Sequence, residues 1–450
     1  MEQFGSAWMG QAPGLGRPHK VKGLTLKHER KSITRGRTRM GLLPAQLKRL
    51  IEQLAPYLPW YGPWLSAQEE SQADEPTWAS PPLVTASVLE EHYYIGQNPL
   101  NERNDVHCYR TSGTSSGLRK SIYYSEADEE AYIRIKLEVF RSILGPYGYK
   151  SALADMGTGH AEATAVEVLR GLGMDVDSIS FRLPIEQHLE RLESFKPEVL
   201  YTMPSILNRI VLAAADPSSY GIKHVVLVGE IASPAWIEQV AERLGLPASR
   251  ITDTYGSIEI GTIAYYSHEH GRYLLTEGLI AEGLRAEDIS RDLEPLSDEA
   301  EERVLVLTSA VREAFPAVRY VTYDVVRDLR PILVDGCWTM SFHSLVKRIG
   351  PDLKHGEKIS IYDIENVVYR HIEQASVRVK VSGNAIQVCV YAPGLSDGDM
   401  SLIQDDLEQC IPEIGIMIES GIIDRIKVVR GTLEDSDDSQ SIKNKKIFYE

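Results

Sequence analysis

The sequence predicts an α/β fold, with a large N-terminal domain of mixed or parallel sheets covered by helices, a β-rich subdomain, and a small α+β C-terminal lid domain. Three observations carry this prediction. Helical and strand-like segments alternate from residue 151 to about 260, as expected for parallel strands connected by covering helices. Residues 270–345 then become β-rich, and residues 350–450 return to a mixture of helices and strands.

The N-terminal segments come first. Residues 1–40 are basic, contain few acids and show no amphipathic period, which is typical of a mobile arm. A targeting or RNA-contacting role is the alternative interpretation. Helical spacing begins at "LLPAQLKRLIEQLAPYL", where Leu47, Leu50, Ile51 and Leu54 share one face. After the strand-like "VHCY", Ser125 and Asp128 form the capping-box pattern of a long helix.

The alternating region contains four predicted helices and three predicted strands. The helices are "ATAVEVLRGLGM", "IEQHLERLESF", "SILNRIVLAAA" and "PAWIEQVAERLG", and the strands are "PEVLYTM", "HVVLVGE" and "RITDTYGS". Two of these strands end near Glu230 and Tyr255, at the edge where α/β sheets usually bind ligands.

The C-terminal part divides into a β-rich region and a region with both helical and strand-like patterns. Strand-like segments are "RYLLTEGLIAE", "ERVLVLTSAV" and "AVRYVTYDVV". After a Gly/Pro/Lys-rich link, "IYDIENVVYRHI" predicts a helix, "VRVKVSG" and "AIQVCVYA" a hairpin, "SLIQDDLEQCI" a helix and "IDRIKVVRG" a strand. We therefore expect an arm at 1–40, an N-terminal domain at 41–349 and a C-terminal lid at 350–450.

Composition restricts the class of protein. A formal charge of −16 over 450 residues argues against a nucleic-acid binder or a protein adsorbed on an anionic membrane. Four scattered cysteines without a CxxC pair argue against a zinc ribbon or a disulfide framework and favour a reducing cytoplasm. No apolar run approaches the roughly 20 residues of a membrane helix. A nucleotide cofactor remains compatible with the charge.

The stretch "RTSGTSSGLRK" at 110–120 is a candidate phosphate-binding loop. Hydroxyls and backbone N–H groups around glycines, flanked by cations, can hold phosphates, and the same residues also suit a solvated loop. A P-loop NTPase and a zinc protease are disfavoured, because the chain has no GxxxxGK[ST] loop and no HExxH. Gly157 and Gly159 lack the third glycine of a dinucleotide site.

Five motifs occur in a fixed order along the chain. They are "TSGTSSGLRK" (111–120), "DTYGSIEIG" (253–261), "VREAFPAVRYVTYD" (311–324), "DLKHGEKISIYDIENVV" (352–368) and "SIKNKK" (441–446). The set resembles the adenylate-forming enzymes, in particular the phenylacetate–coenzyme A ligase branch, and "VLYTMPS", "LVGE" and "TEGLIAEGL" fit it too. The resemblance spans residues 42–446, nearly the whole chain.

The resemblance implies an ATP- and Mg²⁺-dependent ligase that converts a carboxylic acid into an acyl-adenylate with release of pyrophosphate. By this resemblance the β- and γ-phosphates are held by Thr111, Ser112, Gly113, Thr114, Ser115, Ser116 and Gly117, with Lys120 as an added cation. Glu259 is similar to the family's Mg²⁺ carboxylate, a hard ligand for a hard ion. A solvated loop acid is the alternative for Glu259.

Other positions are assigned to the nucleotide in the same way. Tyr255 would pack on adenine within the turn formed by Asp253, Thr254, Gly256 and Ser257, and Gly229 and Glu230 would line the base pocket. Asp324 would accept hydrogen bonds from both ribose hydroxyls. Lys443 resembles the lid lysine that reaches the carboxylate and the α-phosphate together. A core tyrosine, a surface acid and a solvated lysine tail are the respective alternatives.

Substrate and acceptor are less clearly encoded. By resemblance, Gly157, Gly159, His160, Met203 and Pro204 flank the acid pocket, and small apolar residues there favour an aromatic acid such as a hydroxybenzoate. The acceptor would be a thiol of coenzyme A or of a carrier protein, and an amine is also possible. The chain could form a homodimer.

Departures from the family pattern leave a second interpretation open. The phosphate loop carries one extra residue with Arg119 where proline is expected, Tyr323 replaces the glycine before the ribose acid, and the GR-x-DD text is missing. A catalytically silent ligand-binding relative, acting as a subunit of a biosynthetic complex, would tolerate such changes. Because only Cys337 stands where some relatives have a cysteine-rich stretch, no structural zinc is expected.

Overall fold

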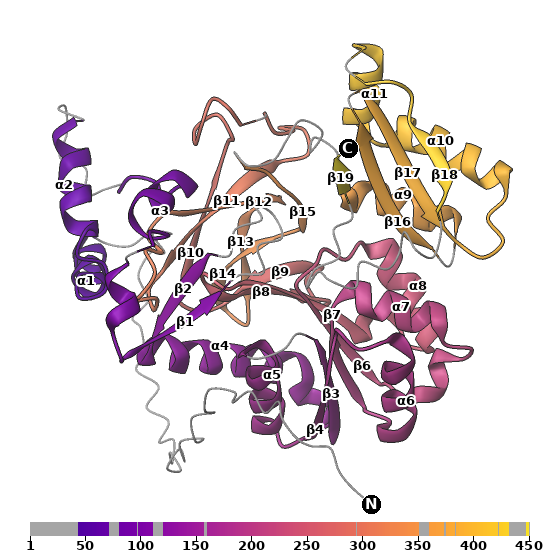
Figure 1. Cartoon of the computed structure of the whole chain (residues 1–450), viewed down its shortest axis with the longest axis horizontal. Helices are drawn as coiled ribbons and strands as arrows, with labels where there is room; N and C mark the ends of the chain where they lie inside the picture. The colour runs from indigo at the N-terminus through magenta and orange to yellow at the C-terminus, as the bar shows by residue number, and fades with distance from the viewer. Residues whose placement is uncertain are drawn as a thin grey trace, which may run out of the picture. The chain divides into compact units, whose positions relative to one another are not determined.

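A computed structural model of the chain describes residues 44–71, 81–96, 98–110, 120–156, 160–293, 295–350, 360–372, 375–382, 384–421, 423–431 and 447–449. Met40–Glu450 forms one compact unit, and its mixed α/β architecture with a small C-terminal sheet confirms the predicted fold class (Figure 1). The basic arm lies outside the described residues, so the predicted domain limits stay predictions.

The largest sheet has nine strands in the order β13-β14-β9-β8-β7-β6-β5-β3-β4. Their bounds are β3 (Ser151–Met156), β4 (Asp175–Ser180), β5 (Val199–Thr202), β6 (His224–Val228), β7 (Ile251–Ser257), β8 (Gly261–Ser267), β9 (Arg272–Leu275), β13 (Arg330–Val334) and β14 (Cys337–Phe342). The pairs from β4 to β7 are parallel, and those from β7 to β13 are antiparallel. The predicted alternating region thus forms the parallel half.

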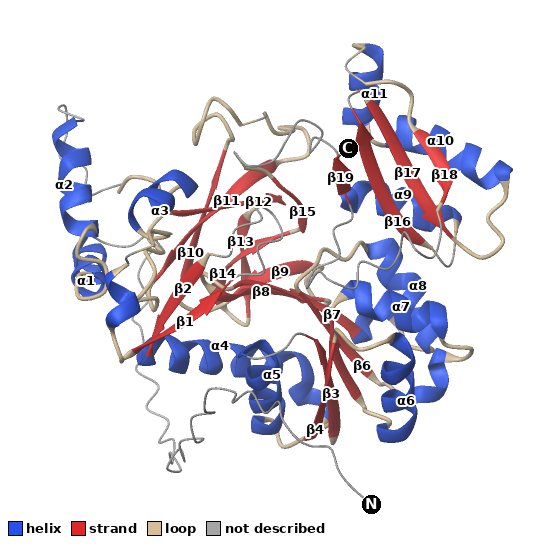
Figure 2. Cartoon of the chain, viewed as in Figure 1, coloured by secondary structure: helices blue, strands red, loops and turns tan. Residues whose placement is uncertain are grey.

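Helices cover both faces of this parallel half (Figure 2). They are α4 (Glu126–Leu144) and α5 (His160–Gly171) on one face, and α6 (Ile185–Phe195), α7 (Pro204–Ala213) and α8 (Pro234–Leu244) on the other. Because side chains alternate along a strand, Ala152 and Ala154 pack with α4 and α5, whereas Leu153 packs with α6 and α7. Both faces are therefore apolar, as a buried parallel sheet requires.

A second, four-stranded sheet has the order β10-β11-β12-β15, and β1 and β2 form a hairpin. The strands are β1 (Val106–Arg110), β2 (Ser121–Ser125), β10 (Leu279–Leu284), β11 (Glu302–Ser309), β12 (Tyr320–Arg327) and β15 (Ser344–Arg348). The nearby helices are α1 (Pro44–Leu54), α2 (Tyr61–Ser71) and α3 (Ala86–His92). Leu47, Leu50 and Leu54 are buried in the core that these elements share, which confirms most of the predicted stripe on α1.

The C-terminal sheet has the order β18-β17-β16-β19. Its elements are α9 (Ile361–His371), β16 (Ser376–Ser382), β17 (Ala385–Tyr391), α10 (Asp397–Cys410), α11 (Pro412–Glu419), β18 (Lys427–Arg430) and β19 (Ile447–Tyr449). The predicted hairpin is confirmed, since β16 and β17 are antiparallel. Helix α9 contacts α8, where Gln239 Nε2 donates to the Ile372 carbonyl over 2.7 Å.

The described residues also include short 3-10 helices: η1 (Pro99–Glu102), η2 (Gly145–Tyr147), η3 (Pro217–Tyr220) and η4 (Ala248–Arg250). Of the helices in the described ranges, none has the length and apolar composition that crossing a membrane would take.

Candidate active site

Two predicted nucleotide residues meet where β7 and β12 approach each other. The Tyr255 hydroxyl donates to Asp324 Oδ2 over 2.5 Å, and the Asp324 backbone N–H donates to Thr322 Oγ1 over 3.1 Å. Asp324 Oδ1 accepts no hydrogen bond from any described residue and lies 3.8 Å from Arg348 Nη1. This carboxylate is therefore held by one oxygen and keeps acceptor capacity on the other.

Arg348 is a site residue that sequence reasoning did not place. It stands directly opposite Asp324, because β15 pairs with β12 in the register Asp324↔Arg348. The neighbouring Asp324 carboxylate raises the pKa of Arg348 above its ordinary value, with Tyr320 and Glu259 adding to the effect. The guanidinium therefore stays charged beside the predicted ribose acid. Only the strand register reveals this pairing, since 23 residues, 325–347, separate the two positions.

The residue before Asp324 has an unusual backbone. Tyr323 has φ +61°, a left-handed conformation that glycine adopts without steric cost and that a bulky residue rarely adopts. Its ring is buried, and its hydroxyl accepts the Ala86 backbone N–H over 3.1 Å. Tyr323 thus occupies a backbone conformation that favours glycine, and its buried ring and hydroxyl contact hold it there.

The turn that carries Glu259 connects β7 to β8 and is closely packed. A Cβ on Gly256 would stand 2.7 Å from the Gly261 carbonyl oxygen, so this position requires glycine. The Tyr124 hydroxyl donates to the Ile258 carbonyl over 2.6 Å, and Arg312 Nε donates to the Glu259 carbonyl over 2.9 Å. The backbone is held by both contacts, which fixes the position from which the half-buried Glu259 side chain extends.

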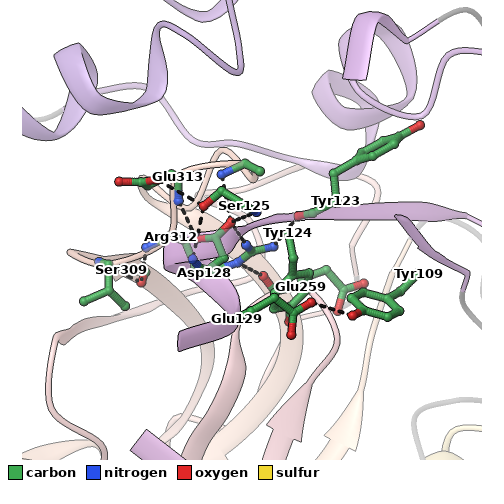
Figure 3. A network of polar contacts seen from close by, with 12 residues as sticks. Tyr109, Tyr123, Tyr124, Ser125, Asp128, Glu129, Glu259, Ser309, Arg312 and Glu313 are labelled. Atoms are coloured by element: carbon green, nitrogen blue, oxygen red, sulfur yellow. Dashed lines mark hydrogen bonds and ion pairs between the residues drawn. The ribbon is translucent and has the colours of Figure 1, made fainter. Parts of the chain in front are cut away.

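Figure 3 shows the network behind this turn, in which Arg312 and Asp128 lie face to face. They form a short ion pair in which both side chains are buried. Asp128 also accepts the backbone N–H groups of Glu313 and Ala314 over 2.8 and 3.0 Å, and Arg312 Nη2 donates to the Tyr123 carbonyl over 3.0 Å. A buried ion pair with this many partners connects α4, β2 and the Glu259 turn.

The same Asp128 completes the N-terminal cap of α4. Its backbone N–H donates to Ser125 Oγ, and its carboxylate accepts the Ser125 backbone N–H, both over 3.1 Å. This confirms the predicted capping box. Ser125 Oγ also donates to Glu313 over 3.0 Å, so the cap and the ion pair form one network.

Asp253 lies inside the structure rather than at a surface. The Tyr273 hydroxyl donates to Asp253 Oδ2 over 2.5 Å, while Oδ1 is buried without a hydrogen-bond partner among the described residues. Burial raises the pKa of the Asp253 carboxyl to about 7. Asp253 is thus a buried residue of β7, the strand that leads into the Glu259 turn, and its contact with ATP stays a prediction.

The predicted base and acid pockets adjoin at the ends of β5 and β6. Glu230 accepts both the backbone N–H and the hydroxyl of Ser205, each over 2.8 Å. Met203 side-chain atoms lie 3.8 Å from where a Cβ on Gly229 would stand, and Gly229 has φ +88°. Pro204 begins α7. Four of the predicted pocket residues are therefore neighbours in space.

Other predicted site residues cannot be placed. Thr111–Gly117, Gly157, Gly159 and Lys443 lie outside the described residues, and of His160 only the backbone, at the start of α5, is described. Lys120 Nζ is 3.9 Å from Glu90 and 4.9 Å from the centre of the Tyr94 ring. No group of three or more His, Cys, Asp or Glu side chains in the described part of the chain could hold a metal.

The arrangement suits a nucleotide and a hard cation. Asp324 offers a carboxylate oxygen with remaining acceptor capacity, close to the Tyr255 hydroxyl and the Arg348 cation, which suits a ribose and an adjoining phosphate. Glu259 offers one carboxylate on a rigid turn, and Mg²⁺ commonly uses one or two protein carboxylates together with substrate phosphates. The residues present therefore fit ATP and Mg²⁺.

Comparisons with known proteins identify relatives of this chain. Residues 354–434 match the family model of the fumarate–diaminopropanoate ligase C-terminal domain. Fumarate–(S)-2,3-diaminopropanoate ligase from Enterobacter agglomerans is 33% identical over 382 residues, which cover 85% of this chain and 94% of that protein. Phenylacetate–coenzyme A ligase from Thermus thermophilus is 24% identical, over 70% of this chain and 69% of its own.

Solved structures show the same fold. A 2-hydroxyisobutyryl-CoA ligase in its postadenylation state superimposes with a TM-score of 0.68 at 13% identity, covering 90% of this chain and 88% of that one. An open conformation of the same ligase, in complex with its acyl-AMP and CoA, gives a TM-score of 0.55.

Proposed function

The chain belongs to the family of fumarate–diaminopropanoate ligase within the adenylate-forming enzymes, and we propose that it activates a small carboxylic acid with ATP and then joins it to an amine. The observation that carries the proposal is the 33% identity over 94% of a relative named as a fumarate–diaminopropanoate ligase. The ribose-acid geometry at Asp324 supports the ATP-dependent half.

The chemistry has two balanced steps. A carboxylate oxygen attacks the α-phosphorus of ATP, the bond to the β-phosphate oxygen breaks, and pyrophosphate leaves from an acyl-adenylate. An amine nitrogen then attacks the acyl carbon, AMP leaves, and the nitrogen loses a proton as the amide forms. Negative charge develops on phosphoryl oxygens in the first step, so catalysis depends on positioning and cations. Mg²⁺ would neutralise part of this charge.

The residues would divide the work as follows. Asp324 binds the ribose hydroxyls and Tyr255 packs beside the base, while Glu259 holds Mg²⁺. The segment Thr111–Gly117 and Lys120 hold the outer phosphates. Lys443 brings a cation to the carboxylate and the α-phosphate from the C-terminal module. Arg348 adds a positive charge beside Asp324, 3.8 Å from its carboxylate.

The acid and the acceptor are the finer part of the proposal. We take a small dicarboxylic acid of the fumarate type as the first candidate substrate, because that acid is named for the relative with the greater identity and coverage. An aromatic acid is the substrate that the small pocket residues suggested. A thiol acceptor is the second candidate function, favoured by the coenzyme A ligase relative. A carrier protein and a homodimer also stay predictions.

The proposal is tested by the exchange of radiolabelled pyrophosphate into ATP with a panel of dicarboxylic, aryl and aliphatic acids. Exchange that depends on one class of acid is expected. Products are then identified by mass spectrometry after adding 2,3-diaminopropanoate or coenzyme A. An amide supports the amine acceptor, a thioester supports the second candidate, and no exchange with any acid would overturn the function.

Lys443→Ala separates the two half-reactions. Adenylation should become undetectable, because the developing charge loses its cation, while reaction of a chemically prepared acyl-adenylate with the acceptor should stay nearly intact. Lys445→Ala is the matched control and should retain both activities. If both half-reactions survive in Lys443→Ala, the assignment of the lysine is wrong.

A further inference from the structure

Helix α4 carries a buried lysine that the proposed mechanism does not use. Lys136 is 4% exposed, and its Nζ lies 5.6, 5.9 and 5.2 Å from the ring centres of Tyr132, Phe140 and Tyr201. These rings come from two turns of α4 and from β5. A cation over aromatic faces gains some stabilisation.

This lysine has no anionic partner in the described structure. Within the described ranges no carboxylate forms an ion pair with Lys136, whereas the equally buried Arg312 is paired with Asp128. Burial lowers the pKa of Lys136, but electrostatic and hydrogen-bond interactions with Tyr132 and Tyr201 outweigh it and raise the pKa above its ordinary value. A buried ammonium thus persists at neutral pH, and such a charge is costly unless an anion compensates it.

The surroundings of Lys136 connect it to the candidate active site. Tyr132, one turn earlier on α4, lies so close to Gly261 that a Cβ there would stand 2.9 Å from its ring, and Gly261 follows Glu259 by two residues. On the other side, Tyr201 precedes Met203 by two residues on the strand that leads to the predicted acid pocket. Lys136 is therefore connected through Tyr132 to the turn that carries Glu259, and through Tyr201 to the strand that ends next to predicted acid-pocket residues.

Resting on the proposed function, we propose that Lys136 binds the second carboxylate of the acid substrate, so that the enzyme selects a small dicarboxylic acid over its monocarboxylic analogues. When one carboxylate of such an acid is adenylated, the other stays negatively charged and needs a cation away from the phosphates. The ammonium of Lys136 supplies it. A charge-assisted hydrogen bond in a desolvated environment discriminates strongly, and an uncharged analogue would leave the lysine unpaired.

A purely structural lysine gives a different expectation. If the aromatic rings alone explain Lys136, its replacement by methionine should affect all acids alike. If Lys136 recognises a carboxylate, the replacement should affect only acids that carry a second carboxylate. The two alternatives are separated by the ratio of kcat/KM values, which a general loss of folded enzyme does not change.

The experiment compares fumarate with crotonate, in which a methyl group replaces one carboxylate, in the pyrophosphate-exchange assay on the full chain. Wild type should prefer fumarate by about 100-fold or more in kcat/KM. Lys136→Met should lose about 100-fold with fumarate, mainly in KM, while its activity with crotonate stays within about threefold. Lys136→Arg keeps the charge and should keep a preference for fumarate. Lys150→Met, at an exposed lysine, is the matched control and should behave like wild type.

Each outcome decides the question. Equal losses with both acids in Lys136→Met, or a wild type that uses crotonate as well as fumarate, would overturn the inference and leave adenylation standing. If wild type shows no exchange with any acid, the proposed function fails separately, and calorimetric titration with fumarate then decides. Heat of binding that is present in wild type and absent in Lys136→Met supports the inference, and equal heats or no heat in either protein overturn it.

Discussion

Helix α4 contacts one buried cation, Arg312, and carries another, Lys136, and only the first has a carboxylate partner among the described residues. At the N-terminus of α4, Asp128 forms an ion pair with Arg312. Hydrogen bonds connect the two side chains to backbone groups of Tyr123, Ser125, Glu259, Glu313 and Ala314. Near the middle of the same helix, Lys136 has three aromatic rings around it and no carboxylate among the described residues. Both cations are less than 5% exposed.

This difference suggests that the Arg312–Asp128 pair stabilises the fold, whereas Lys136 recognises a ligand. Charges that are neutralised within the protein hold elements in place, and here they fix the turn of Glu259 through its carbonyl. A buried charge that the protein leaves without an anion costs stability, and a ligand can supply the missing partner. The first region should therefore respond to mutation in stability, and the second in substrate choice.

The largest expected effect comes from breaking the internal ion pair. Arg312→Met leaves Asp128 buried without its cation, and we expect a loss of about 3–5 kcal/mol in the free energy of unfolding, measured with urea. Arg312→Met combined with Asp128→Asn should be less destabilised than the sum of the two single changes. A loss below about 1 kcal/mol in Arg312→Met would show that the pair does not hold this region together.

A smaller effect concerns the buried carboxyl of Asp253 on β7. The pKa of Asp253 is about 7 in the folded chain, raised by burial from an unfolded value near 3.8. The folded state therefore keeps a proton that the unfolded state has lost, and stability falls as the pH rises from about 4 through 7. Asp253→Asn cannot ionise, so its stability relative to wild type should improve by about 1–3 kcal/mol between pH 5 and pH 8.

Thermal or urea unfolding at several pH values tests this prediction. A constant difference between Asp253→Asn and wild type across the range would mean that the carboxyl does not titrate there.

A smaller effect is expected for Tyr255→Phe, which changes one hydrogen bond at the candidate site. It removes the hydroxyl that donates to Asp324 over 2.5 Å and leaves the ring in place. The carboxylate loses one fixed contact, so KM for ATP should rise about fivefold to tenfold, equivalent to about 1 kcal/mol, with little change in KM for the acid. Steady-state exchange kinetics measure both. A change in KM for the acid alone would mean that Tyr255 contacts the acid substrate and not the nucleotide.

The smallest stability effect is expected at the second cation. Because Lys136 has no internal counter-charge, Lys136→Met should not lower the free energy of unfolding without substrate by more than about 1 kcal/mol, in contrast to Arg312→Met. Urea unfolding of the two variants side by side makes the comparison. A loss at Lys136 as large as that at Arg312 would mean that the two regions do not differ.

Much of the fold follows from local patterns. The capping box at Ser125 and Asp128, the alternating helices and strands, and the C-terminal hairpin all depend on neighbours in sequence, so the sequence predicts them. The pairing of Tyr255 with Asp324 depends on two strands 69 residues apart, and only the resemblance to a family indicated that both belong to one site.

Other features depend on tertiary contacts that no local pattern contains. Asp128 looks like a helix cap, and its role as the partner of Arg312, 184 residues away, becomes visible only in three dimensions. Lys136 occupies a helix whose mixture of charged and apolar residues does not distinguish a buried lysine from an exposed one. The positive φ of Tyr323, a conformation that favours glycine, is likewise visible only in the structure.

The central claim is that this chain activates a carboxylic acid as its adenylate. Pyrophosphate exchange by the purified full-length chain, with ATP, Mg²⁺ and fumarate, tests it most directly, with crotonate and a hydroxybenzoate in parallel. The account predicts exchange that requires an acid and is fastest with fumarate. Exchange independent of any acid, or none with any of the three and with the wider panel, would contradict it.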